Sequence, residues 1–162
     1  MRLKSSLITV LLCSLTLVPG TRADISSGLV LYLPLNETSG TTAFDSSGLS
    51  HDATFVNAPA GEAQWTNGWV SGGANINNPF DPALIDYLTI PSTPDLSFDT
   101  VKHFTLACWV KLPTAQIAGA SLIAHGTGGG GEQYDLDINA NKFRIVTRFP
   151  AASGTPPAVA LS

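Results

Sequence analysis

The chain has 162 residues, of which 12% are charged and 44% are hydrophobic, and its formal net charge is −4. This length fits a single domain. The shortage of basic residues argues against binding to nucleic acid or to an anionic membrane surface, because both present dense negative charge.

The first 23 residues have the layout of a secretory signal peptide. Basic Arg2 and Lys4 precede a mostly apolar run at 7–18, and the segment ends on the small residue Ala23. The apolar run is shorter than the roughly 20 residues of a membrane-spanning helix, and no later run is long enough. We therefore predict a secreted, extracellular or cell-surface protein. Cleavage leaves residues 24–162, with five basic and twelve acidic residues and a net charge of −7.

Cysteine use is sparse. Cys13 lies inside the signal segment, so Cys108 is the single cysteine of the mature chain and an intrachain disulfide is excluded. Cys108 sits in an apolar run without a neighbouring base. We expect it to be a small buried apolar residue rather than a catalytic thiol.

Turn-forming residues recur every 8–12 residues or so, which is typical of an all-β sandwich. No segment carries an apolar stripe with helical spacing, and one short helical turn is predicted at Thr93–Phe98. The predicted strands are Leu29–Leu33, Ala53–Asn57, Gly68–Asn75, Tyr87–Ile90, Phe104–Leu112, Ser121–His125, Tyr134–Asn139 and Phe143–Arg148.

For two of these strands, the sequence predicts which side chains share each face. Phe104–Leu112 is apolar on both faces, which indicates a strand covered on both sides. In Tyr134–Asn139 the apolar residues should point inward, and Asp135 and Asp137 should form a solvated face. The sequence Asn-Ala-Asn-Lys at 139–142 predicts a hairpin turn, because Asn tolerates positive φ.

Three segments share a recognisable order and spacing. Gly28–Asp52 holds an Asp-Ser-Ser-Gly loop, Asp86–Leu96 begins Asp-Tyr-Leu-Thr-Ile-Pro, and Phe104–Lys111 has the pattern Phe-Thr-x-x-x-Trp-Val-Lys. Together they resemble LamG-like domains, which are jelly-roll β-sandwiches of the concanavalin A-like lectin group. The likeness covers about residues 28–148 and implies that 24–162 form one antiparallel β-sandwich.

Family members continue with closing strands that this sequence lacks. We therefore expect an incomplete sandwich, truncated at its C-terminal side, in which Leu29–Leu33 lacks its neighbour. We also expect the chain to be part of a longer multidomain protein.

The resemblance implies a non-catalytic module that recognises a glycan or another extracellular ligand. A structural or adhesion spacer in a larger surface protein is the alternative, and a glycoside hydrolase is a third. Glycoside cleavage needs a nucleophile and a proton donor. Asn139 stands where the β-glucanase relatives of the fold carry an acid/base Glu, and an amide cannot donate that proton. We therefore expect no enzymatic activity.

Calcium is the cofactor that the resemblance suggests, as a structural ion. Ca²⁺ prefers carboxylate and carbonyl oxygens from tight loops, and the matching positions are Asp45 and Asp86. The alternative is that Asp45 caps its own turn through backbone N–H groups, an ordinary use of Asp in loops. Both interpretations remain open at this point. The three histidines lack metal-ligand spacing and are expected in loops or at strand ends.

Tryptophan provides the candidate sugar contact. Trp65 and Trp69 lie in a stretch rich in Gly and Asn, where an exposed ring can stack on a pyranose. Trp69 is expected to enter a strand and pack in the core. Trp65 is therefore predicted to be the exposed, ligand-binding ring.

Overall fold

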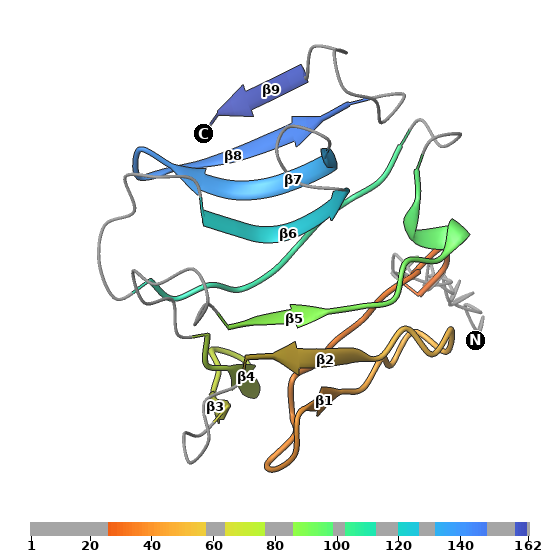
Figure 1. Ribbon diagram of the computed structural model, residues 1–162, viewed down its shortest axis with the longest axis vertical. Coiled ribbons are helices and arrows are strands. Elements are labelled where there is room, and N and C mark those ends of the chain that lie inside the picture. Colours follow the sequence, from red (N-terminus) through yellow and green to blue (C-terminus); the bar gives the residue numbers. More distant parts are fainter. Residues whose placement is uncertain are drawn as a thin grey trace, which may run out of the picture.

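The chain folds into antiparallel β-sheets (Figure 1). The computed structural model describes residues 26–57, 64–76, 86–98, 103–112, 120–126, 132–148 and 158–161. Within them every sheet is antiparallel, and the one helical element is the 3₁₀ turn η2 (Pro94–Leu96). This all-β organisation is compatible with a β-sandwich. No helix among the described residues is long and apolar enough to cross a membrane. The expected signal segment lies outside these ranges.

The first sheet has the order β1-β2-β5. Its central strand β2 (Ala53–Val56) pairs with β1 (Thr42–Ala43) on one side and with β5 (Tyr87–Thr89) on the other. Ala53 and Phe55 are buried, whereas the residues after each of them are more accessible. This period of two is what one covered sheet face produces.

A separate hairpin joins β3 (Trp65–Asn67) to β4 (Gly72–Ala74). The prediction of one strand at Gly68–Asn75 is therefore wrong, because the chain reverses after β3. A Cβ atom on Gly72 would lie 1.9 Å from the carbonyl oxygen of Leu35, so only glycine fits there. The hairpin backbone thus packs directly against the opening segment.

The largest sheet has the order β6-β7-β8-β9 and occupies the upper half of Figure 1. Its strands are β6 (Ala120–Gly126), β7 (Glu132–Asn139), β8 (Lys142–Thr147) and β9 (Ala158–Leu161). The register between β6 and β7 shifts after Ser121, a bulge that bends the edge strand. The short β9 is an element that the sequence pattern did not predict.

Most of the predicted strands are confirmed. β2, β5, β6, β7 and β8 agree with their predicted ranges to within two residues at each end, and η2 falls inside the predicted turn at Thr93–Phe98. In β7, Tyr134 and Ile138 are buried as expected. Asp137 is buried as well, so its expected place on a solvated face is wrong.

Two predicted strands belong to no sheet. Leu29–Leu33 and Phe104–Leu112 both run without a ladder, although Figure 1 draws the second as a nearly straight run between β5 and β6. A β-strand needs a neighbour to satisfy its backbone groups, and no described strand pairs with either run. The expectation that Phe104–Leu112 is covered on both faces is also wrong, since Trp109 is 76% exposed.

An aromatic cluster joins η2 to the largest sheet. The Phe98 and Phe104 rings stack at 4.8 Å, and Tyr134 of β7 lies 5.2 Å from Phe98. The Tyr134 hydroxyl donates to the Leu96 carbonyl at 3.1 Å. Because the buried Tyr134 has both apolar contacts and a partner for its hydroxyl, it can lie in the core without an unpaired polar group.

The β7–β8 turn places two residues at positive φ. Ala140 has φ 49° and Asn141 has φ 63°, the arrangement of a two-residue hairpin turn with left-handed backbone at both positions. Asn141 tolerates this conformation, as predicted, whereas Ala140 does not favour it.

We predict that Ala140→Asn stabilises the protein by about 1 kcal/mol, because Asn adopts left-handed backbone at lower cost. Chemical denaturation measures the change. Ala124→Asn, at an exposed strand position without positive φ, is the matched control and should give no gain. An equal gain from both substitutions would contradict the turn argument.

Candidate functional site

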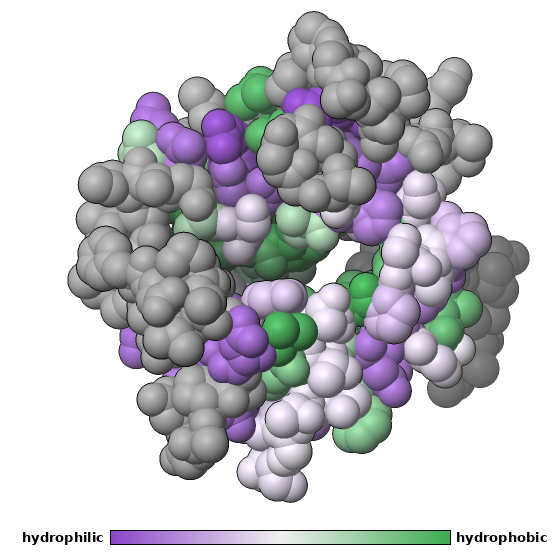
Figure 2. All heavy atoms as spheres, in the orientation of Figure 1, coloured by the Kyte–Doolittle hydropathy of each residue, from purple (hydrophilic) through white to green (hydrophobic). Residues whose placement is uncertain are grey.

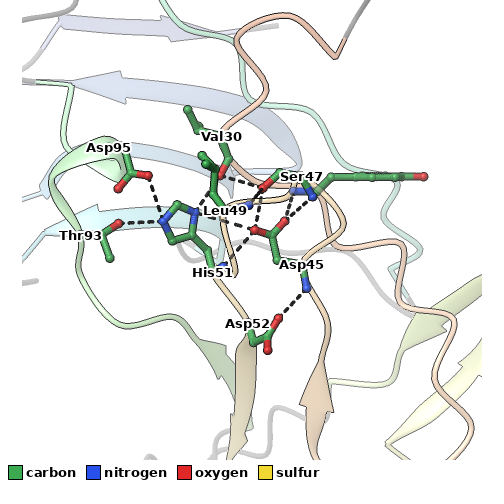
Figure 3. A network of polar contacts seen from close by, with 9 residues as sticks. Val30, Asp45, Ser47, Leu49, His51, Asp52, Thr93 and Asp95 are labelled. Carbon is green, nitrogen blue, oxygen red and sulfur yellow. Dashed lines mark hydrogen bonds and ion pairs between the residues drawn. The ribbon is translucent and has the colours of Figure 1, made fainter.

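The Asp45 carboxylate is the centre of a polar network (Figure 3). Its Oδ1 accepts from the backbone N–H groups of Tyr32 at 2.9 Å and Ser47 at 2.8 Å. Its Oδ2 accepts from the Ser47 hydroxyl at 2.6 Å and from the His51 N–H at 2.9 Å. One buried side chain therefore ties the opening segment to both sides of the loop after β1.

The local sequence explains this geometry. In Asp45-Ser46-Ser47-Gly48 the carboxylate bonds to the N–H two residues later, which is an Asx-turn. Gly48 has φ 93°, a conformation that favours glycine. Burial by itself would raise the pKa of Asp45, but the hydrogen bonds from Ser47, Tyr32 and His51 outweigh it and lower the pKa to about 2.

His51 extends the network to a third segment. Its Nδ1 lies 2.8 Å from the Val30 carbonyl oxygen, an atom that can only accept, so Nδ1 carries a proton. Its Nε2 lies 3.0 Å from the Asp95 carboxylate and 3.2 Å from the Thr93 hydroxyl. His51 is buried, and it joins the opening segment to η2. Histidine spacing alone did not indicate this role.

The geometry around Asp45 is that of a capped turn. Both carboxylate oxygens already accept two hydrogen bonds each, which is the turn-capping alternative. Asp86 is buried beside β5, and the β2–β5 register places it at the opposite end of β2 from Asp45. No group of three or more His, Cys, Asp or Glu in the described ranges is arranged to hold a metal. Calcium binding stays a prediction, and the geometry favours two separate roles for these aspartates.

We predict that Asp45→Asn destabilises the protein by about 2 kcal/mol at neutral pH, because the new amide nitrogen cannot accept two of the four hydrogen bonds. The loss should shrink as pH falls from about 4 towards 2, where the wild-type carboxylate becomes protonated. A depressed pKa gives stability that is present above the unfolded value of 3.8 and lost below it. Urea unfolding at several pH values measures both effects.

Asp52→Asn is the matched control for this experiment. Asp52 accepts one bond, from the Asp45 N–H at 2.8 Å, and an amide oxygen can still accept it. A similar loss for both variants, or a loss independent of pH in Asp45→Asn, would contradict the central place of Asp45.

Trp65 is half-buried, whereas Trp69, which was expected in the core, is the more exposed of the two. The Trp65 ring packs edge-on against Phe55 at 5.3 Å, and its N–H donates to the Gly40 carbonyl at 2.8 Å. Trp69 is 83% exposed, so its expected burial is wrong. It lies outside β3 and β4, in the turn between them, where neither sheet face covers it.

A second exposed indole lies beside Trp69. Trp109 is 76% exposed, and the two ring centroids are 6.4 Å apart with 38° between their planes. They come from distant parts of the sequence, the β3–β4 turn and the run Phe104–Leu112. The sequence predicted Trp109 in a strand covered on both faces. Because side chains alternate along a strand, Trp109 was expected on the face opposite Phe104 and Leu106, and this was the one sequence signal that set it apart from them.

The two carboxylates of β7 have different partners. Asp137 is buried and accepts from the Arg144 guanidinium, with Nε at 2.9 Å from Oδ1 and Nη2 bonded to Oδ2. This bond to Asp137 raises the pKa of Arg144 above its ordinary value. Asp135 accepts from the Ser121 hydroxyl at 3.1 Å. Asp137 is thus held by a cation, which favours its charged form.

An apolar hollow lies beside the run Phe104–Leu112. Figure 2 shows the molecule hollowed between the sheets, with hydrophobic surface inside. A cavity of about 280 Å³ is lined by Leu106, Ala107, Cys108, Val110, Leu122, Leu136 and Phe143. Cys108 is a free thiol and is exposed, so the expectation of a buried cysteine is wrong. Partial burial nevertheless raises the pKa of this thiol.

Comparison of the chain with protein-family models, with curated proteins and with solved structures finds no match.

Proposed function

We propose that the chain is an exported, non-catalytic binding module, a LamG-like jelly roll, that recognises glycans through Trp69 and Trp109. The observation that carries this proposal is the pair of exposed indoles whose centroids are 6.4 Å apart. Exposing two large rings to water is unfavourable, and contiguous exposed apolar surface commonly marks a binding site.

The chemistry of the pair suits a sugar. An indole offers a flat apolar face on which the C–H face of a pyranose stacks, and its N–H can bond to a hydroxyl. The 38° tilt between Trp69 and Trp109 offers two surfaces to successive units of a chain rather than one flat plane. Because the protein is acidic, we expect neutral glycans to bind better than sulfated or uronate-rich ones.

The other classes of function have less support. A glycoside hydrolase requires a free proton donor and a nucleophile, but Arg144 engages Asp137 and Asn139 ends the strand. A structural spacer in a larger surface protein needs no exposed indole pair. A glycan array on which the folded protein binds nothing would favour the spacer.

We predict that Trp69→Ala and Trp109→Ala each weaken glycan binding at least tenfold. Tryptophan side chains that become buried against a ligand are typical hot spots of binding energy. A glycan array identifies the ligand, and titration calorimetry measures its affinity. Tyr32→Ala removes an exposed aromatic ring elsewhere and is the matched control. Unchanged affinity in both tryptophan variants would refute this site.

A further inference from the structure

The opening segment contains the sequence Asn36-Glu37-Thr38. It matches the pattern Asn-x-Ser/Thr, with x other than Pro, that marks the acceptor of an N-linked oligosaccharide in a secreted protein. It is the one match in the 162 residues, because every other asparagine lacks a Ser or Thr two positions later. A three-residue pattern also arises by chance, so the surroundings of these side chains decide whether the asparagine suits a sugar.

The two residues that define the acceptor are accessible in the folded chain. Asn36 and Thr38 are both exposed, whereas Glu37 between them is half-buried. The Glu37 carboxylate accepts from the backbone N–H of Phe44 at 2.8 Å, which turns the middle residue towards the protein. The chain then bends at 38–41, before β1. The pattern therefore lies on a surface loop with its asparagine and its hydroxyl residue on the accessible side.

The Asn36 amide is oriented by the β3–β4 hairpin. Its Oδ1 lies 3.1 Å from the backbone nitrogen of Gly72, and a backbone N–H can only donate. The amide oxygen therefore faces Gly72, and Nδ2 lies on the other side of the planar amide. Nδ2 makes no hydrogen bond within the described ranges. A sugar on Nδ2 leaves the amide oxygen in place, so it costs the folded chain no hydrogen bond.

The backbone at the acceptor is held closely as well. A Cβ atom on Gly72 would lie 2.8 Å from the Asn36 Cα atom, so the loop and the hairpin touch through their main chains. The same hairpin carries Trp69 in its turn, three residues before Gly72. The attachment point is therefore fixed beside the hairpin that presents the exposed indole.

We infer that Asn36 is an N-glycosylation site, modified from an oligosaccharide that is linked through a diphosphate to a lipid. In the transfer, Nδ2 forms a bond to C1 of the first sugar, and the bond from C1 to the diphosphate oxygen breaks. The lipid diphosphate leaves, and Nδ2 gives up one of its two protons. The inference rests on the proposed export of the chain, because secretory pathways supply this donor.

The test is expression of the full chain through the secretory pathway of a human cell line. The secreted protein should be heavier than residues 24–162 alone by one N-linked oligosaccharide. Peptide N-glycosidase should remove the added mass and leave an aspartate at position 36, which peptide mass spectrometry locates. A secreted chain that carries no sugar on Asn36 would overturn the inference.

A second expression separates the acceptor from the export signal. Residues 1–23 are replaced by the signal segment of a secreted host protein, and the oligosaccharide should again be attached to Asn36. Export and modification with the replaced segment alone would refute the native signal and leave the acceptor standing. Export without modification would refute the acceptor, whatever the native segment does.

The matched variants distinguish modification from a structural role of Asn36. Thr38→Ala should abolish the oligosaccharide although the bond from Asn36 to Gly72 is untouched, and Thr38→Ser should retain it. Asn36→Asp keeps an oxygen that accepts from Gly72 but offers no amide nitrogen, so it should carry no sugar. Circular dichroism of the secreted variants checks that each is folded. An oligosaccharide that persists in Thr38→Ala would contradict the assignment. None of these results depends on glycan binding by Trp69.

Discussion

The Asp45 carboxylate is the constraint on which the lower half of the structure depends. It accepts four hydrogen bonds from Tyr32, Ser47 and His51, and it thereby holds the opening segment against the loop that leads into β2. His51 extends the same network to η2 through Asp95. A buried carboxylate with four donors is favourable in its charged form, whereas an apolar residue in its place would leave these backbone groups unpaired.

The network also explains how the opening segment around Tyr32 is held although it pairs with no strand in the described part of the chain. The Tyr32 N–H bonds to Asp45, and the Tyr32 carbonyl accepts from the Ser46 N–H at 2.8 Å. A loop thus provides the partners that a neighbouring strand would otherwise provide. Thr105–Leu112 pairs with no strand in the part of the chain that the structure describes. The apolar hollow and the exposed Trp109 both lie along this run.

The sequence pattern predicted strands well wherever apolar alternation and a clear turn coincide. β7, β8 and the turn between them follow from Tyr134–Asn139, Phe143–Arg148 and the asparagine-rich connection. It failed where pairing depends on a distant neighbour. The alternation of Phe104–Leu112 is that of a strand, but no described strand pairs with it. Two residues, Thr42 and Ala43, are too few to be recognised as β1 without β2.

The sequence by itself determined the all-β class and most strand positions, because these depend on local periodicity. It offered the Asp45 turn as one of two interpretations of the Asp-Ser-Ser-Gly loop. Only the tertiary structure decided exposure. It placed Trp65 in contact with Phe55 and left Trp69 and Trp109 in solvent. It also buried Asp137 beside Arg144. Burial depends on which segments distant in sequence meet across a sheet face, and that information is absent from the alternation of a single strand.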